Sequence, residues 1–356
     1  MSVKKGTTNI SKIKKGAVGI SKVYKGTNLV FEEEKPLWLI IGSAWWISED
    51  GGNYTKIEGS PGGGYDGLIC YRGNFYTAYS PAGGSGQNYL RKYPIENIRQ
   101  GNRTSTQTTP FTDNSSDSPV SLATDGQSVI VVTLNGKNTL CYSFDGGDTW
   151  ENVSAGSSNT ILQYIGGGLF LYAKKISDRG GAANGKYYYW NKNKPTTYYS
   201  STYKLPDESY PRNGEAEWLN NMWYCNGIYY VSTTDGVYYG TRNQAEGKLS
   251  VDGLSSFVYC YGRYYAIKKG SEYTTLYYST DGKTFTERKY NGKDFFYRDR
   301  GRNIKSLERN NGKLCFYGPY SSAGSGMGGY IDKNFNIVNT SGTYAYNHAC
   351  NKYPKI

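Results

Sequence analysis

Short runs of aromatic and β-branched residues alternate along this chain with clusters of glycine, asparagine and aspartate. Residues 129–132 and 229–231 are examples of such runs, and each is bounded by turn-forming residues. This pattern predicts β-strands, and no segment forms a convincing amphipathic helix. The composition agrees, because 38 tyrosines favour strands and 46 glycines suit turns. We therefore expect an all-β fold.

A turn followed by an aromatic strand recurs at intervals of about 35 to 60 residues, averaging near the length of a four-stranded propeller blade. Residues 37–41 form a further strand of this kind, but no strand precedes it within its own blade. Residues 342–347 could supply the missing inner strand and close the ring, which removes exposed sheet edges. We expect a β-propeller of seven blades, with six as the alternative. The recurring segments are 73–76, 126–130, 167–170, 227–230, 262–265 and 312–316.

Three near-copies of one turn motif each follow an aromatic or apolar run, at residues 48–54, 143–150 and 279–285. The serine and aspartate side chains can bond to nearby backbone N–H groups, glycine accepts a positive φ, and the closing aromatic residue can pack under the turn. We expect structural roles for the residues that define the motif. They are Ser48, Asp50, Gly52, Ser143, Asp145, Gly147, Trp150, Ser279, Asp281 and Phe285.

The motif resembles the Asp-box of sialidase-like β-propellers, written roughly Ser-x-Asp-x-Gly-x-Thr-Trp. The copy at 143–150 matches in full, whereas the other two are one residue shorter and end in Tyr or Phe. In that family the motif is structural, so the resemblance implies a fold and not a chemistry. It also implies that each copy lies between the third and fourth strands of a blade, on the face away from the usual ligand site.

The first 34 residues carry a ten-residue repeat with Lys-Gly in a fixed register, and seven lysines precede the first acidic residue, Glu32. A signal peptide needs an apolar stretch that this segment lacks, and no membrane span is evident in the sequence. The repeat predicts three short strands joined by glycine turns, too small a sheet to be stable alone. We expect residues 1–34 to dock onto a partner and residues 35–356 to form the propeller, although a solvated basic tail is the alternative.

Residues 20–30 of this leader resemble a leader of tailed-bacteriophage virion proteins that precedes a distal domain, and residues 10–16 form a looser copy. The resemblance implies a phage tail or fibre protein that assembles in the host cytoplasm and is located in the virion. Its N-terminus would bind other virion proteins, and its propeller would face the host.

Catalytic and metal-binding patterns are weak. The Phe/Tyr-Arg-Ile-Pro sequence that carries the first arginine of sialidases does not occur, and nothing in the spacing of the acidic residues pairs two carboxylates for glycoside hydrolysis. His348 is the only histidine, and no Cys-x-x-Cys pair is present, which argues against zinc. We expect no catalytic residue, no metal and no cofactor; the alternative is a glycan depolymerase or sialidase-like glycoside hydrolase.

The formal net charge is +12, of which the leader supplies seven positive charges. In the propeller, residues 298–302 form the only arginine cluster next to aromatic residues, so a nucleic-acid partner is not expected. A host-surface glycan or another anionic polymer would suit a basic patch, and no membrane insertion is expected.

Long Gly-rich loops near residues 80–88, 178–186 and 319–329 are predicted to join second and third strands, opposite the Asp-box turns. Sugar recognition commonly uses aromatic faces, although core packing is the simpler role for any one aromatic residue. The candidates for contact with a host polymer, by stacking or charge pairing, are Tyr79, Tyr89, Arg179, Trp190 and Tyr320.

Together these features favour a non-catalytic phage tail-fibre or receptor-binding protein with an N-terminal docking segment. Two alternatives stay open: the glycan-degrading enzyme on the same fold, and a purely architectural virion component.

Overall fold

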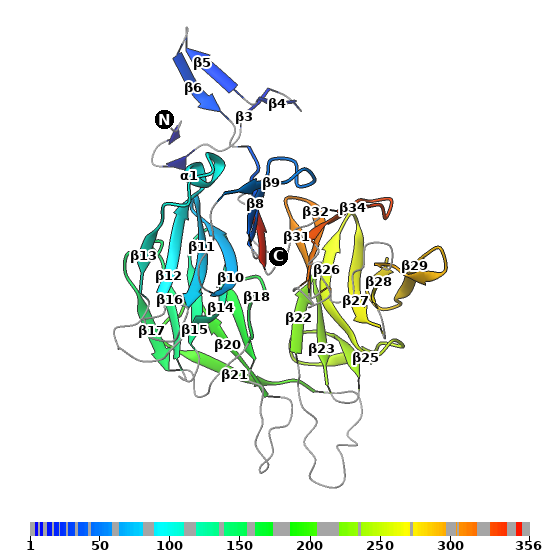
Figure 1. Cartoon of the computed structure of the whole chain (residues 1–356). Coiled ribbons are helices and arrows are strands. Elements are labelled where there is room, and N and C mark those ends of the chain that lie inside the picture. Colours follow the sequence, from blue (N-terminus) through cyan, green and yellow to red (C-terminus); the bar gives the residue numbers. More distant parts are fainter. Residues whose placement is uncertain are drawn as a thin grey trace. The chain divides into compact units, whose positions relative to one another are not determined.

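The chain divides into two compact units, Met1–Pro36 and Leu37–Ile356, two residues beyond the boundary expected from the sequence. Figure 1 shows the computed structural model. It describes residues 4–5, 8–9, 13–15, 18–20, 22–25, 28–32, 35–41, 44–58, 64–80, 89–109, 119–134, 139–154, 161–173, 186–204, 221–233, 236–270, 273–296, 304, 306–318, 328–339 and 347–350.

The N-terminal unit contains three antiparallel two-stranded hairpins, one for each ten-residue repeat. The registers pair Lys5 with Thr8, Lys15 with Val18, and Lys25 with Asn28. Each pair flanks a Gly-led dipeptide in the sequence, the composition that two-residue hairpin connections favour. The strands are β1 (Lys4–Lys5), β2 (Thr8–Asn9), β3 (Ile13–Lys15), β4 (Val18–Ile20), β5 (Lys22–Lys25) and β6 (Asn28–Glu32).

The second unit is a seven-bladed β-propeller, as the sequence predicts (Figure 1). Seven antiparallel sheets follow one another, and we number them as blades 1 to 7. Blade 1 has the order β35 (Asn347–Cys350), β7 (Trp38–Ile41), β8 (Trp45–Ser48), β9 (Thr55–Ile57). Blade 2 is β10 (Gly64–Tyr71), β11 (Asn74–Ser80), β12 (Tyr89–Pro94), β13 (Thr106–Thr108), with helix α1 (Ile95–Arg99) after β12. Blade 3 is β14 (Pro119–Thr124), β15 (Ile130–Leu134), β16 (Thr139–Ser143), β17 (Glu151–Ser154).

The remaining blades repeat this meander, and blade 6 carries a fifth strand. Blade 4 is β18 (Ile161–Tyr164), β19 (Leu169–Ala173), β20 (Lys186–Asn191), β21 (Tyr198–Thr202). Blade 5 is β22 (Asn221–Cys225), β23 (Ile228–Ser232), β24 (Val237–Gly240), β25 (Ala245–Lys248). Blade 6 is β26 (Leu254–Cys260), β27 (Arg263–Lys269), β28 (Thr274–Ser279), β29 (Thr286–Tyr290), β30 (Lys293–Asp294). Blade 7 is β31 (Ser306–Asn310), β32 (Lys313–Tyr317), β33 (Gly328–Ile331), β34 (Ile337–Asn339).

The C-terminal strand closes the ring by supplying the first strand of blade 1. His348 pairs with Ile40 and Ala349 with Leu39, antiparallel. The expected closing segment, 342–347, is corrected to Asn347–Cys350. The tyrosines at 344 and 346 suggested the earlier position, but the register with β7 selects the residues that follow them. Residues 342–346 lie outside the described part of the chain.

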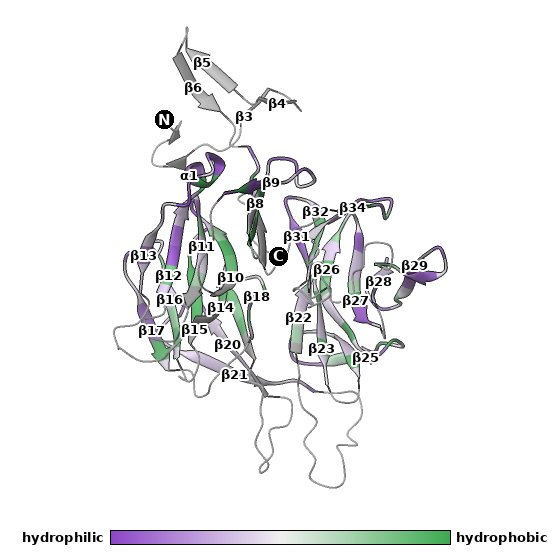
Figure 2. Ribbon diagram, in the orientation of Figure 1, coloured by the Kyte–Doolittle hydropathy of each residue, from purple (hydrophilic) through white to green (hydrophobic). Residues whose placement is uncertain are grey.

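The core lies in the seams between blades, where apolar side chains of facing sheets interdigitate. One cluster joins Leu39 and Ile41 of blade 1 to Leu68 and Phe75 of blade 2, and equivalent clusters occupy other seams. In Figure 2 hydrophobic colouring lies on β10, whereas β29 is hydrophilic. The blades therefore stack through apolar faces and leave their outer strands polar.

A basic side chain crosses each seam at the end of the blades where third and fourth strands connect. Its partner on the neighbouring blade is a carboxylate or an aromatic ring, so both ion pairs and cation–π contacts contribute. The pairs are Arg99–Glu49, Lys92–Asp148, Lys192–Asp125, Arg242–Tyr189, Lys283–Tyr239, Arg288–Phe335 and Lys313–Trp38.

Candidate functional site

The three Ser/Asp turns, residues 48–54, 143–150 and 279–285, occupy the same place in blades 1, 3 and 6, between the third and fourth strands. In the second turn Asp145 Oδ1 accepts hydrogen bonds from the backbone N–H groups of Asp148 and Thr149, both at 3.0 Å. Ser143 Oγ donates to the same oxygen at 2.8 Å and accepts from the Gly147 N–H at 2.7 Å. One carboxylate thus organises the whole turn.

The other two turns repeat this arrangement. Asp50 Oδ1 accepts from the backbone N–H groups of Gly52 and Asn53, both at 2.8 Å. Asp281 Oδ1 accepts from the Lys283 and Thr284 N–H groups at 2.7 and 2.8 Å. Because these oxygens are already bonded inside the turn, they are poorly placed to act on a ligand.

The pKa values of these carboxyls reflect their bonds. Burial by itself raises the pKa of Asp50 and Asp145, but the donated hydrogen bonds outweigh it and hold both well below the usual 3.8. For Asp281 the backbone hydrogen bonds from Thr284 and Lys283 have the largest effect and lower the pKa in the same way. All three side chains are therefore carboxylates at neutral pH.

Two of the turns are also bonded to the preceding blade through a buried tyrosine. Tyr76 on β11 donates its hydroxyl to the Gly146 carbonyl at 2.9 Å, and Tyr230 on β23 donates to the Gly282 carbonyl at 2.7 Å. Both tyrosines have no exposed surface. In the first turn Lys313 donates to the Asp50 carbonyl instead. The turns therefore join blades as well as strands.

The closing aromatic residues pack beneath their turns. Trp150 Nε1 donates to the Gly147 carbonyl at 3.1 Å and to Thr108 Oγ1 of blade 2 at 2.8 Å. Phe285 is buried and meets Tyr230 and Phe257 edge-on, with centroids 6.0 and 5.6 Å apart. Their role in the described structure is packing.

Sequence reasoning missed two related turns. Asp332, between β33 and β34, accepts from the Asn334 and Asn336 N–H groups, both at 2.8 Å. It has no serine two residues earlier, so the motif did not reveal it. Asp125, between β14 and β15, accepts from the backbone N–H groups of three residues that follow it.

Asp125 is also the partner in a buried ion pair between blades. Lys192 Nζ of blade 4 lies 2.6 Å from Asp125 Oδ2, and the carboxylate side chain is only 3% exposed. Burial by itself raises the pKa of Asp125, but the bonds from Lys192 and Ser128 outweigh it and hold the pKa well below 3.8.

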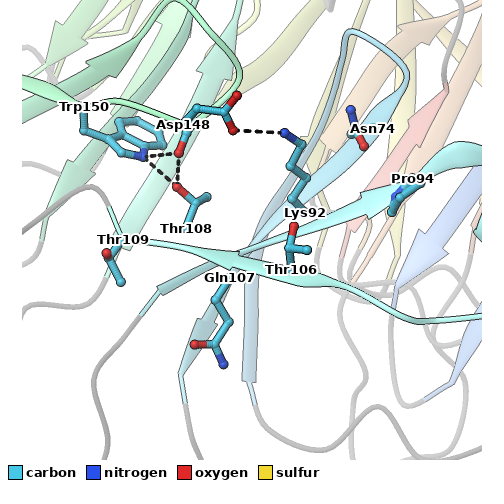
Figure 3. Close-up of a pocket in the computed structure, with 10 residues that line it drawn as sticks. Asn74, Lys92, Pro94, Thr106, Gln107, Thr108, Thr109, Asp148 and Trp150 are labelled. Carbon is cyan, nitrogen blue, oxygen red and sulfur yellow. Dashed lines mark hydrogen bonds and ion pairs between the residues drawn. The ribbon is translucent and has the colours of Figure 1, made fainter.

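An open groove of about 700 Å³ lies at the seam of blades 2 and 3 (Figure 3). It runs along β13, next to the second Ser/Asp turn. Such a volume is within the usual range of ligand sites, about 300–1,000 Å³. The lining residues are Asn74, Lys92, Pro94, Thr106, Gln107, Thr108, Thr109, Gly147, Asp148 and Trp150.

The lining of the groove mixes polar and apolar surface, and its lysine and its aspartate face each other. Lys92 Nζ lies 3.5 Å from Asp148 Oδ1 across the seam, with the side chains 25% and 73% exposed. Thr108 donates to the Gly147 carbonyl and accepts from Trp150, so its hydroxyl is engaged within the wall. The side chains of Thr106 and Thr109 have no hydrogen-bond partner within the described part of the chain. The sequence signal was the polar run 104–109, whose position beside blade 3 could not be read from the sequence.

The prediction that Trp190 contacts a polymer is wrong. Trp190 has no exposed surface, donates its indole N–H to the Pro195 carbonyl at 2.9 Å, and packs between Tyr142 and Phe170. It belongs to the core between blades 3 and 4. Residues 187–190 are aromatic on both sheet faces, so alternation gave no sign of which one is buried.

Of the other contact candidates, the described residues bring only Tyr79 and Tyr89 together, on neighbouring strands of blade 2. Tyr89 is half-buried, accepts from Arg91 at 3.1 Å, and carries that guanidinium 5.6 Å from its ring centre. Tyr79 lies opposite Tyr89 in the β11–β12 register. Arg179 and Tyr320 lie outside the described residues, so their role as contacts stays a prediction.

Strand order fixes which end of each blade carries the long loops. The strands that flank the loops near residues 80–88, 178–186 and 319–329 are the second and third of blades 2, 4 and 7. The Ser/Asp turns join third and fourth strands. Because neighbouring strands are antiparallel, these two sets of connections leave opposite ends of the third strand. The loop residues themselves lie largely outside the described part.

No known family model and no curated protein matches this chain. Several solved structures have a similar fold. A proposed 6-phosphogluconolactonase from Bacteroides fragilis has a TM-score of 0.55 at 10% identity, covering 89% of this chain and 98% of that one. YCF48 from Cyanidioschyzon merolae has a TM-score of 0.51 at 8% identity, covering 81% and 88%. The β-propeller domain of Cps50 (Swd1) from Myceliophteria thermophila has 0.51 at 7% identity, covering 78% and 85%. These similarities establish the fold alone.

Within the described residues, no group of three or more His, Cys, Asp or Glu side chains could hold a metal ion. None of the helices in that part of the chain is long and apolar enough to cross a membrane.

Proposed function

We propose that this chain is a non-catalytic bacteriophage virion protein, a tail fibre or receptor-binding protein whose propeller recognises a host-surface polymer. The observation that supports this most is the division of the chain into a small repeat unit, Met1–Pro36, and a complete propeller. An attachment protein needs these two parts, one to join the particle and one to meet the cell.

The N-terminal unit supports a docking role because its sheets are small. Its three hairpins have strands of two to five residues, and each is a separate two-stranded sheet. Isolated hairpins of this size are marginal in water, so contact with a partner would stabilise them. Other virion proteins would be that partner.

The propeller supports a rigid display role. Its three Ser/Asp turns carry the residues and the hydrogen bonds that suit Asp-boxes of sialidase-like propellers, with the carboxylates bonded to the backbone. They strengthen the scaffold at one end of the blades. Long loops leave the other end, and loops displayed on a rigid scaffold are where binding residues commonly lie.

Competition for adsorption tests this function. Host cells would be incubated with the purified full chain before phage is added, and the fraction of unadsorbed phage would be counted. We expect adsorption to fall as the protein concentration rises, because the free propeller occupies the receptor. A chain that begins at Leu37 should compete equally well, since it keeps the propeller.

A loop variant tests which part of the propeller binds. It replaces residues 81–88 and residues 174–185 each by Asn-Gly, the dipeptide that favours two-residue hairpins. This variant keeps the described strands of blades 2 and 4 and should compete less. Undiminished adsorption at saturating full-length protein would refute the proposal. Release of reducing sugar from the cell surface by the purified chain would instead establish the hydrolase alternative.

A further inference from the structure

We propose that the groove between blades 2 and 3 binds an uncharged glycan chain, with Asp148 as the principal acceptor for sugar hydroxyls. This site is separate from the long loops and lies at the opposite end of the blades. The inference rests on the proposed function, which supplies a polymer as the ligand class, and it names the chemistry of a polymer bound at this second site, besides the long loops.

The polar groups of the groove suit hydroxyl recognition. The Asp148 side chain is 73% exposed, and a carboxylate can accept bonds from two neighbouring hydroxyls at once. Lys92, on the blade 2 side of the groove, can donate to a ring or hydroxyl oxygen. Thr106 adds a hydroxyl that is exposed and has no partner in the described structure, and it pairs with Lys92 in the β12–β13 register.

The groove also offers apolar contact. Trp150 is half-buried at the groove, and its indole N–H is fixed by Thr108 and Gly147. Pro94 lines the far end. Figure 3 shows Trp150, Asp148 and Lys92 arranged along one side of β13. An aromatic ring next to hydroxyl-binding groups matches the alternating apolar and polar surface of a sugar ring.

The charge balance favours an uncharged ligand. Lys92, the one cation among the described residues that line the groove, already lies 3.5 Å from a carboxylate. An anionic polymer would meet Asp148 before finding an unneutralised partner, because like charges repel across the open groove. An extended peptide is less suitable, since β13 has three residues and offers few backbone groups to an added strand.

Binding of the full chain to immobilised polysaccharides tests the inference by biolayer interferometry. The neutral panel is dextran, mannan and galactan, and the anionic panel is polygalacturonate and dextran sulfate. We expect at least one neutral polymer to bind and to bind more tightly than either anionic polymer. Binding restricted to the anionic panel, or to neither panel, would overturn the inference.

Asp148→Asn separates the two ligand classes by the sign of its effect. It removes one negative charge at nearly constant size, so a neutral glycan should bind at least tenfold more weakly, whereas an anionic polymer would bind more tightly. Thr106→Ala, which keeps all charges, should weaken neutral binding about threefold or more. Thermal unfolding of each variant checks that the fold is retained.

Glu246→Gln is the matched control. Glu246 is a half-exposed carboxylate 3.5 Å from Lys283, the same separation as the Lys92–Asp148 pair, at the seam of blades 5 and 6. Its replacement should change neutral binding less than twofold. Equal losses in Asp148→Asn and Glu246→Gln would show a general charge effect and overturn the site. Neutral binding that survives both Asp148→Asn and Thr106→Ala would place the ligand elsewhere and overturn the inference, while the adsorption assay decides the proposed function independently.

Discussion

An aspartate at a protein surface usually bonds mainly to water, yet the three turn aspartates of this propeller bond to the backbone. In the turn at 143–150 the Asp145 carboxylate accepts two backbone N–H bonds, one from the Ser143 hydroxyl and one from the Thr149 hydroxyl. Losing such an acceptor leaves several donors without a partner. The cost then exceeds that of a single average hydrogen bond.

Asp145→Ala should therefore lower the free energy of unfolding by about 1–3 kcal/mol, because each donor left unsatisfied costs about 1–3 kcal/mol when buried and less at the surface. Asp145→Asn keeps one carbonyl oxygen as an acceptor and should lose less. Urea unfolding followed by tryptophan fluorescence measures both. Equal stability of the wild type and both variants would contradict a structural role for this carboxylate.

Acid should destabilise the propeller through the same groups. The pKa values of Asp50, Asp125, Asp145 and Asp281 are lower in the folded chain than the usual 3.8. A carboxyl with a depressed folded pKa contributes its full stability above the unfolded pKa, and loses it as the pH falls toward the folded value. The urea midpoint should fall steadily below about pH 4. A midpoint constant down to pH 2.5 would argue against these hydrogen bonds.

The buried ion pair between Lys192 and Asp125 allows a comparison with an exposed pair. Lys192→Met leaves the 3%-exposed Asp125 carboxylate without its cation, and breaking a buried pair commonly costs about 3–5 kcal/mol. We expect the low end, about 3 kcal/mol, because backbone N–H groups still bond to Asp125. Lys283→Met removes a cation whose carboxylate partner Glu246 is half exposed and should cost less than about 1 kcal/mol. Similar losses in the two variants would contradict this assignment of the buried pair.

At the scale of the element, the strand that closes the ring makes the propeller one cooperative unit. β35 covers the inner edge of β7, whose residues Leu39, Ile40 and Ile41 have no exposed surface. Without β35, blade 1 would lose its first strand and expose an unpaired sheet edge. Closure therefore couples the two ends of a 320-residue unit, Leu37–Ile356.

A chain that ends at residue 346 should lose more than about 4 kcal/mol of unfolding free energy, a loss that single substitutions rarely reach. A chain that ends at Cys350 keeps β35 and serves as the control. Urea unfolding of the two chains gives the comparison. If the shorter chain matched the control within about 1 kcal/mol, ring closure would contribute little.

Much of this element order could be predicted from the sequence, but the residue contacts across the seams between blades could not. The recurring turn-plus-aromatic segments lie at the second strands of the seven blades, because glycine turns and alternating apolar residues are local signals. Lys313 and Trp38, or Lys192 and Asp125, are distant in sequence, and only the closed ring brings them together. The groove beside β13 was missed for the same reason, and Trp190 was misjudged because its neighbours are aromatic on both faces.

At the scale of the whole molecule, several basic residues of the propeller lie between blades, at the end where third and fourth strands connect. Lys92, Lys192 and Lys283 each have a carboxylate across a seam, and Arg242 and Lys313 lie over aromatic rings. The formal net charge of +12 already subtracts these carboxylate partners, so the excess positive charge comes from other basic residues. Seven of the positive charges are lysines of the leader, where they could meet an acidic partner protein.

The position of the protein in assembled particles tests its proposed role most directly. Electron cryomicroscopy would compare phage particles that carry the full chain with particles assembled from a chain that begins at Leu37. We predict propeller density at the host-facing periphery with the full chain and no such density with the shorter chain. The shorter chain alone should still unfold at the same urea midpoint. A propeller enclosed by other virion proteins would contradict the receptor-binding role, and normal incorporation of the shorter chain would contradict attachment through residues 1–34.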